Sequence, residues 1–178
     1  MTATQETIYL GGGCFWGVEH LLKQAQGVLD VESGYMGGMT ANPTYQEVCS
    51  GRSFHAEVVR VVYDTAVLPT EALLYVFFHL HDATQLNRQG PDVGTQYRSC
   101  IYTTTAEQLQ AAPTALHREQ HRQQPRWVST TVATAPVFAP AEAYHQDYFE
   151  RHGYHGGCHV CDVEAVLNEY KTHYGGGG

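Results

Sequence analysis

The five cysteines of this 178-residue sequence are its most reactive side chains. They are Cys14, Cys49, Cys100, Cys158 and Cys161. An odd number of cysteines, in a chain whose start shows no export signal, argues against a static disulfide scaffold. Free thiols, redox chemistry or metal binding explain them better. Of the five, Cys49 and Cys100 are expected to be small buried hydrophobic residues, one in a loop and one in a strand.

Cys14 directly follows three glycines and precedes a segment with helical periodicity. A thiol at the start of a helix meets unpaired backbone N–H groups and the positive end of the helix dipole, and both favour the nucleophilic thiolate. The alternative is a buried structural cysteine beside a tight turn. A phosphate site is a weaker explanation, because neither GxxxxGKS nor GxxxxGKT occurs.

Phe15 and Trp16 come directly after this thiol. Adjacent helix positions do not share a face, so at most one of the two rings points fully into the core. The other ring is then available to bind an apolar group beside the reactive sulfur. The alternative is a pair of ordinary core aromatics.

Glu57 lies in segment 54–63 (FHAEVVRVVY), which is predicted to form a strand. Neither face of this strand is cleanly polar, so both faces are expected to be covered. Burial would raise the pKa of the carboxyl and allow it to act as a general acid near neutral pH. The alternative is a glutamate that is exposed or paired with an arginine.

Tyr45, Tyr97 and Asp92 lie in two long polar segments, 36–52 and 82–98, that are expected to be loops. A phenol can donate a hydrogen bond to a substrate oxygen. A loop tyrosine is more often a packing residue, however. The physical chemistry of the sequence alone does not distinguish these two among its twelve tyrosines.

Cys158 and Cys161 form a CxxC pair near the C-terminus, with three histidines close by: His152, His155 and His159. Such a pair can cycle between dithiol and disulfide, or it can supply half of a zinc site. The glycines around it predict mobility, which suits a cysteine that must reach another sulfur.

The elements that must position these residues alternate irregularly. This order fits an α+β two-layer domain better than a regular parallel doubly wound sheet. Thr105 and Gln108 form a capping box that begins one helix, and Pro113 is expected to kink or break it. Strands are expected at 7–10, 28–34, 54–63, 99–103 and 130–138, and helices at 15–25, 69–81, from 105 onward, and at 140–151.

Composition excludes several classes of protein. The net charge is −8 and only 16% of residues are charged, with no basic stripe to bind nucleic acid. No apolar run approaches the ~20 residues of a membrane span. The start, MTATQETIYL, predicts no secretion signal. We therefore expect a cytoplasmic monomer.

Five segments, in order, resemble the A-type peptide-methionine sulfoxide reductases. They are 11–17 (GGGCFWG), 42–51 (NPTYQEVCSG), 55–64 (HAEVVRVVYD), 81–99 (HDATQLNRQGPDVGTQYRS) and 143–151 (AYHQDYFER). The resemblance implies a single-domain α+β two-layer sandwich with a ferredoxin-like core and long loops. It also implies a catalytic part over 1–152 and an irregular, mobile tail over 153–178 that belongs to the same domain.

The family's chemistry assigns roles to these residues. Cys14 would attack the sulfur of the S epimer of methionine sulfoxide, free or in proteins, and Glu57 would protonate the oxygen. Tyr45 and Tyr97 would hydrogen-bond that oxygen. Two further assignments complete the site: Phe15 and Trp16 would form the pocket for the ε-methyl group, and Asp92 would help to orient the site.

The resemblance also implies a catalytic cycle. Loss of methionine would leave a sulfenic acid on Cys14, which a tail cysteine would convert to a disulfide for thioredoxin or another dithiol to reduce. Cys158 is the first choice for this resolving cysteine, with Cys161 as an alternative or as a relay. No cofactor and no metal are expected.

Three positions depart from the family pattern: Phe54 replaces a usual glycine, Ala83 a usual proline and Cys100 a small apolar residue. None of them touches the expected chemistry. Two other functions stay open. A thiol peroxidase or general thiol–disulfide oxidoreductase would use Cys14 and the CxxC pair without Glu57, and a zinc-binding interaction module would use only the tail.

Overall fold

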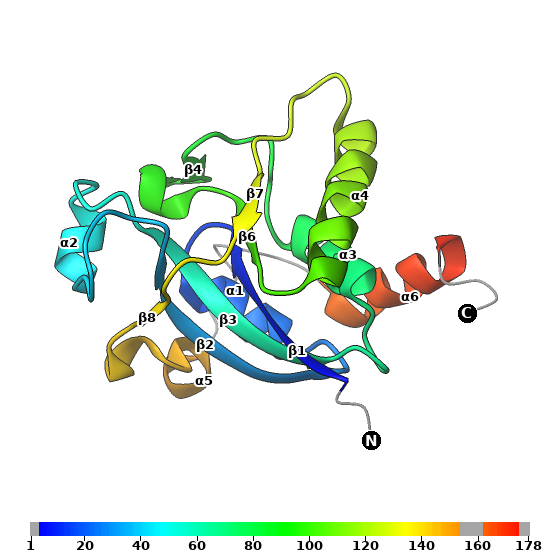
Figure 1. The fold of residues 1–178 in the computed structure, drawn as a ribbon, viewed down its shortest axis with the longest axis horizontal. Helices are drawn as coiled ribbons and strands as arrows, with labels where there is room; N and C mark the ends of the chain where they lie inside the picture. The colour runs from blue at the N-terminus through cyan, green and yellow to red at the C-terminus, as the bar shows by residue number, and fades with distance from the viewer. Residues whose placement is uncertain (1–3, 154–161, 175–178) are drawn as a thin grey trace.

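A six-stranded sheet is the frame of this protein, for which a computed structural model describes residues 4–153 and 162–174 (Figure 1). The strand order is β7-β6-β1-β3-β2-β8, and all neighbours are antiparallel except β6 and β7. The strands are β1 (Gln5–Gly11), β2 (Val28–Met36), β3 (Ala56–Asp64), β6 (Cys100–Thr103), β7 (Thr131–Thr134) and β8 (Ala139–Pro140).

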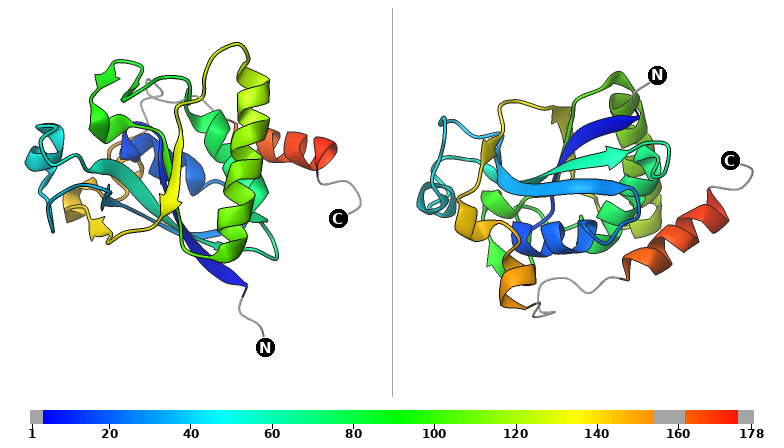
Figure 2. Two further views of the ribbon diagram at one scale, coloured as in Figure 1. Left: turned by 45° about the horizontal axis from the view of Figure 1, so that its top comes forward. Right: turned by 90° about the horizontal axis from the view of Figure 1, so that it is seen from below.

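Two crossover helices complete the core of the fold. Helix α1 (Phe15–Leu22) connects β1 to β2, and α3 (Thr70–Leu80) lies between β3 and β6 in the chain. Both pack on the same face of the sheet (Figure 2). The inner strand order β6-β1-β3-β2 with these crossovers is the ferredoxin-like arrangement, so the predicted α+β class and core are confirmed.

Both faces of β3 are buried, as its sequence predicts. One face contributes Val59 and Val61 to the main core beneath α1 and α3. The opposite face contributes Val58 to a smaller cluster, which Phe138 helps to cover. A carboxyl on this strand is therefore removed from water whichever way it points.

The two long segments expected to be loops contain short regular elements. Helix α2 (Tyr45–Cys49) begins where the Thr44 side chain accepts a hydrogen bond from the Glu47 N–H at 3.2 Å. Strands β4 (Arg88–Gln89) and β5 (Asp92–Val93) form a hairpin, and the 3₁₀-helix η1 (Thr95–Tyr97) follows it. The loop prediction for 36–52 and 82–98 is therefore wrong at these places.

The single helix expected over 140–151 is also wrong. The chain forms the 3₁₀-helix η2 (Ala143–His145) and then α5 (Tyr148–His152), with Asp147 between them at φ 53°. Contacts distant in sequence override the helical pattern: the Gln146 amide bonds both backbone groups of Ser33, at 2.9 and 2.8 Å.

Pro113 does not end its helix. Helix α4 (Ala106–Gln123) continues through this proline, and Thr105 caps it as predicted by accepting from the Gln108 N–H at 3.2 Å. The buried Ala112 and Ala115 lie on either side of the proline. We attribute the continuity to the packing of these residues, which offsets the one hydrogen bond that a proline removes.

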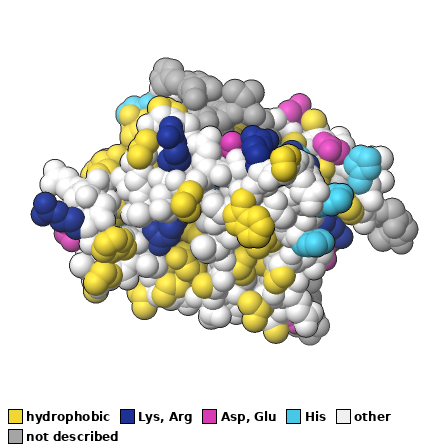
Figure 3. Space-filling model, turned by 90° about the horizontal axis from the view of Figure 1, so that it is seen from above, with side chains coloured by type: hydrophobic (Ala, Val, Ile, Leu, Met, Phe, Trp, Pro, Cys, Tyr) yellow, Lys and Arg dark blue, Asp and Glu magenta, His cyan; other side chains and the backbone are white. Residues whose placement is uncertain are grey.

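Within the expected irregular tail, Val163–His173 form helix α6, which packs beside α3 (Figure 2). The Asp162 side chain caps it, and Leu167 and Tyr170 are buried. In the described ranges, no helix is long and apolar enough to cross a membrane. On the face drawn in Figure 3, lysine and arginine side chains form no continuous stripe.

Candidate active site

Cys14 stands at the N-cap of α1 and is partly exposed. The preceding Gly13 has φ 94°, a conformation that side-chain-bearing residues rarely adopt. A Cβ at Gly11 would lie 2.7 Å from Cys100 Sγ and 3.0 Å from the Glu57 carbonyl oxygen. The glycines therefore let the chain turn sharply from β1 into α1 while it passes close to β3.

Glu57 lies directly behind this turn. Its Oε1 accepts a hydrogen bond from the backbone N–H of Phe15, the residue after Cys14, at 3.1 Å. The side chain is only 2% exposed. Burial raises the pKa of Glu57 to about 8, because desolvation outweighs the hydrogen bond from Phe15. At neutral pH this carboxyl is therefore mostly protonated.

Tyr97 and Asp92 approach the same place from η1 and β5. Burial raises the pKa of Tyr97, and the negative charges of Glu57, Cys49, Asp92 and Cys14 raise it further. Burial also raises the pKa of Asp92. Because these charges act on one another's pKa values, Cys14, Glu57, Asp92 and Tyr97 lie in one site, although two of them belong to a segment that is expected to be a loop.

Tyr45 enters the site from the first residue of α2. Its backbone N–H donates to Glu142 Oε2 at 3.0 Å, and the Tyr35 hydroxyl donates to Glu142 Oε1 at 2.9 Å. Glu142 thus fixes the start of α2 against β2. Burial raises the pKa of Tyr45, so its hydroxyl is a neutral hydrogen-bond donor at ordinary pH.

The two aromatic residues after Cys14 have different surroundings. Phe15 is 1% exposed and packs in the core, 5.7 Å from the Tyr35 ring. Trp16 is partly exposed, and its ring stacks on Tyr148 with centroids 3.8 Å apart and planes 7° apart. Only Trp16 of the two offers ring surface at the site, with Phe15 behind it.

The remaining cysteines also differ from one another. Cys100 is completely buried, as expected, but Cys49 is exposed, so the prediction of a buried residue is wrong for it. Cys49 is the last residue of α2, one helical turn after Tyr45, and each of the two groups shifts the pKa of the other. The short helix turns Cys49 toward the site. Cys158 and Cys161 lie outside the described residues.

An ionic cluster joins α1 to the region of α5. The ammonium of Lys23 pairs with Asp147 and lies 3.8 Å from carboxylate oxygens of Glu19 and Glu150. Glu19, Asp147 and Glu150 are the one group of acidic, histidine or cysteine side chains in the described ranges that is close enough to hold a metal ion. Because the lysine already supplies a cation there, we assign the cluster to structure.

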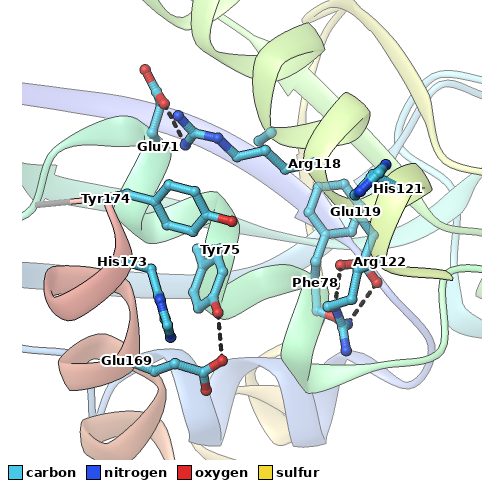
Figure 4. Close-up of a pocket in the computed structure, with 11 residues that line it drawn as sticks. Glu71, Tyr75, Phe78, Arg118, Glu119, His121, Arg122, Glu169, His173 and Tyr174 are labelled. Carbon is cyan, nitrogen blue, oxygen red and sulfur yellow. Dashed lines mark hydrogen bonds and ion pairs between the residues drawn. The ribbon is translucent and has the colours of Figure 1, made fainter.

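A separate cavity of about 310 Å³ lies between α3, α4 and α6 (Figure 4). Its acidic and basic side chains face each other: Arg118 bonds Glu71, and the Tyr75 hydroxyl bonds Glu169, at 2.7 and 2.8 Å. Its lining includes none of the candidate site residues and no thiol. We therefore place the chemistry at Cys14 rather than in this cavity.

Two residues that support the site, Glu142 and His145, have no role among the expectations drawn from the sequence. Their bonds to Tyr45 and to Trp16 span 97 and 129 positions of sequence. No local pattern could reveal these pairings. The one signal in the sequence is that His145 lies inside AYHQDYFER, a segment that carries the family resemblance.

A thiol at a helix start, with a protonated carboxyl and two phenols beside it, suits a thiol-dependent oxidoreductase. Comparison with known proteins agrees. A family model described as peptide methionine sulfoxide reductase matches residues 6–174. The chain therefore belongs to the peptide methionine sulfoxide reductase family and is an oxidoreductase.

Individual relatives support this assignment. Over 146 residues the chain is 50% identical to peptide methionine sulfoxide reductase MsrA of Haloquadratum walsbyi. This match covers 82% of this chain and 83% of that protein. Over 169 residues it is 48% identical to MsrA of Paenarthrobacter aurescens, covering 95% and 96%.

Solved structures show the same fold. Reduced Mxr1 from Saccharomyces cerevisiae superposes with a TM-score of 0.82 at 32% identity, covering 88% of this chain and 92% of that chain. Methionine sulfoxide reductase A of Corynebacterium diphtheriae superposes with a TM-score of 0.78 at 35% identity, covering 90% and 85%.

Proposed function

We propose that this enzyme reduces the S epimer of methionine sulfoxide, free or in proteins, through a sulfenic acid on Cys14. The observation that carries the proposal is the pairing of Cys14, at the start of α1, with Glu57, whose buried carboxyl is bonded to the next backbone N–H at 3.1 Å. A nucleophile and a neutral acid are thus held side by side.

The proposed first step uses both groups. The Cys14 thiolate donates its electron pair in a bond to the sulfoxide sulfur, and Glu57 gives its proton to the sulfoxide oxygen. The hydroxyl group then carries the electron pair of its S–O bond to the Cys14 sulfur, and the new bond between the two sulfurs breaks with its electron pair left on the methionine sulfur. Methionine leaves in the reduced state, and Cys14 is oxidised to sulfenic acid. A sulfoxide oxygen leaves poorly until it is protonated, so the acid is essential.

The other site residues orient the substrate in this proposal. The hydroxyls of Tyr45 and Tyr97, kept neutral by their raised pKa values, donate to the sulfoxide oxygen. Trp16 provides the exposed wall for the ε-methyl group, and Phe15 supports it from the core. Asp92 raises the pKa of Glu57 further by its negative charge and so helps to keep the acid protonated.

Turnover requires a second thiol. We propose that Cys158 condenses with the sulfenic acid, releasing water and forming a disulfide that thioredoxin reduces. Cys161 is the alternative resolving residue or the next step of a relay. Mxr1 from Saccharomyces cerevisiae shares this fold, and a structure of Mxr1 in complex with Trx2 supports thioredoxin as the class of reductant. A cytoplasmic location stays a prediction of the sequence.

The test is a single turnover without reductant. Reduced enzyme is incubated with separated S and R epimers of a blocked methionine sulfoxide, and methionine and free thiols are counted. We expect product from the S epimer alone, with two thiols lost per first product. Cys14→Ser should form none. Product from both epimers, or substantial product from Cys14→Ser, would contradict the proposal, and activity toward peroxide alone would indicate a thiol peroxidase.

A further inference from the structure

His81 is a buried titratable residue that the proposed chemistry does not use. It directly follows α3, and it is 8% exposed. Its imidazole lies against the backbone of Gly12, in the turn that leads to Cys14. A Cβ built on Gly12 would stand 3.0 Å from Cγ and Nδ1 of the ring. The imidazole therefore packs directly against the turn that carries the nucleophile.

Two hydrogen bonds, one on each nitrogen, hold this imidazole in place. Nδ1 lies 2.9 Å from the Phe77 carbonyl oxygen, which can only accept, so Nδ1 carries a proton. Nε2 lies 2.8 Å from Ser99 Oγ, which in turn lies 2.7 Å from Thr130 Oγ1. A hydroxyl can donate or accept, so the bond at Nε2 fits a neutral and a charged ring alike. The ring cannot rotate without breaking a buried bond.

The partners of the imidazole belong to separate parts of the fold. Phe77 lies in the last turn of α3, Ser99 directly precedes β6, and Thr130 directly precedes β7. All three residues are buried. A buried polar group that loses its partner costs free energy, because water does not replace the lost bond. Movement of the ring is therefore opposed by a helix and by the starts of two strands.

Gly12 lies between two points of the backbone that are fixed by other contacts. The strand before it is held in the sheet, and the Phe15 N–H after it is bonded to Glu57. The glycines between these points have wide conformational freedom. The imidazole of His81 supplies a rigid contact in this interval, and the contact bears on where the Cys14 thiol stands relative to Glu57.

We propose that His81 is a positioning residue, whose hydrogen-bonded imidazole supports Gly12 and thereby sets the position of the Cys14 thiol at the start of α1. The inference rests on the proposed function, in which Cys14 is the nucleophile and stands beside the acid Glu57. In this role His81 takes no part in bond breaking and acts through the backbone of the turn.

Two substitutions test the contact as a pair. Gly12→Ala places a methyl group 3.0 Å from a ring that is held in place, so the turn has to move. The φ of Gly12 is not positive, so alanine itself adds no backbone strain there. His81→Asn removes most of the ring, while its amide can still donate to the Phe77 carbonyl. Each single variant should impair the enzyme, but the double variant should be no worse than His81→Asn alone.

Ser99→Ala is a milder variant, which keeps the proposal testable if His81→Asn does not fold. It removes the bond at Nε2 and leaves the imidazole present. Thr103→Val is the matched control, because it removes a buried hydroxyl from the end of β6 that is farther from the turn. The control can lower the stability of the sheet, but it should leave the position of Cys14 unchanged.

The first readout is the reactivity of the Cys14 thiol, which requires no substrate. Reduced protein is treated with iodoacetamide over a range of pH, and the labelled Cys14 peptide is quantified by mass. A thiol displaced from the N–H groups at the start of α1 forms its thiolate less readily. The labelling midpoint should rise by about half a pH unit in Gly12→Ala and Ser99→Ala, and it should not move in Thr103→Val. An unchanged midpoint in both variants would overturn the proposal.

The second readout is single-turnover methionine formation against the concentration of the S epimer. A displaced nucleophile is poorly aligned for attack, so the limiting rate should fall about ten-fold in Gly12→Ala and by a smaller factor in Ser99→Ala. The half-saturating concentration should stay nearly unchanged, because the pocket for the substrate is untouched. A rise in that concentration at an unchanged limiting rate would assign His81 to substrate binding and overturn the proposal.

The two readouts distinguish failure of this inference from failure of the proposed function. If the parent enzyme forms no methionine from either epimer, the proposed function fails, and the labelling midpoints still decide whether His81 positions the thiol. If the parent is active but the double variant shows the product of two independent losses, the contact between His81 and Gly12 has no role. The inference then fails while the proposed function stands.

Discussion

At the scale of single residues, burial determines which form of each group is present. Glu57 keeps its proton at neutral pH because its carboxyl is 2% exposed and desolvation raises its pKa to about 8. As the pH rises through about 8, the protonated fraction falls, and an acid that has lost its proton cannot assist the departure of oxygen.

The pH profile of Glu57→Gln tests this role. In the parent, single-turnover methionine formation should decline above pH 8, because Glu57 ionises there. In the variant the rate should be lower by about 10²–10⁴-fold, and this alkaline decline should be absent, because an amide has no proton to lose. Rates between pH 6 and 9.5 provide the measurement. An alkaline decline that persists in the variant would assign it to another group.

Sequence could identify Cys14 and Glu57 because their signals are local. A cysteine after three glycines and a glutamate in an apolar strand suggest their chemistry without any partner. His145 and Glu142 depend on contacts more than 90 positions away, as their bonds to Trp16 and Tyr45 show. Such contacts exist only in the folded chain.

At the scale of elements, β8 connects the sheet to the supporting residues. Gly34 of β2 pairs with Pro140 of β8, and the ring of Phe138 lies over Gly34. A Cβ at Gly34 would stand 2.3 Å from that ring and 2.6 Å from the Ala139 carbonyl oxygen. The absence of a side chain therefore lets β8 pair closely, and β8 leads directly to Glu142.

Gly34→Ala should displace β8. We expect the free energy of unfolding to fall by about 1–3 kcal/mol, as for other overpacked sites, and the half-saturating substrate concentration to rise. Denaturant unfolding and single-turnover kinetics measure the two effects. Adding Phe138→Leu should restore part of the stability. Gly51→Ala is the comparison, because a Cβ there meets nothing within 4 Å, although its φ of 75° strains a side chain; a similar loss of affinity there would contradict the argument.

The same scale shows which elements sequence patterns could predict. The capping box at Thr105 is local and predicts its helix, whereas the equivalent signal at Thr44, with Glu47 three residues later, lies inside a composition that is typical of a loop. The break at Asp147 could not be found, because its backbone N–H is bonded by Glu19 of α1, 128 positions away.

At the scale of the whole molecule, the segment between α5 and α6 has a packed helix as an anchor on each side. Helix α5 ends at His152 beside α1, and α6 begins at Val163, which is buried in the main core. Cys158 and Cys161 lie between these anchors in sequence, and Cys161 is two positions from the buried Val163. Cys158 is five positions from Val163, so a longer stretch of chain connects it to this anchor.

Single serine variants should therefore differ. Cys158→Ser should yield about one equivalent of methionine but little turnover with thioredoxin, because the sulfenic acid is left unresolved. Cys161→Ser should still form the first disulfide. Thiol counting, peptide mapping by mass and thioredoxin-coupled turnover distinguish them. Full thioredoxin turnover in Cys158→Ser would assign resolution to Cys161 instead.

The bond between the Phe15 N–H and Glu57 Oε1 has a consequence for the end of the chemical step. Once the acid has given its proton away, it remains as a conjugate base in a site that excludes water. At that moment the bond becomes charge-assisted, and such bonds are roughly twice as strong as neutral ones. The contact that holds the acid in place thus grows stronger as the acid acts, and it favours the products over the reactants.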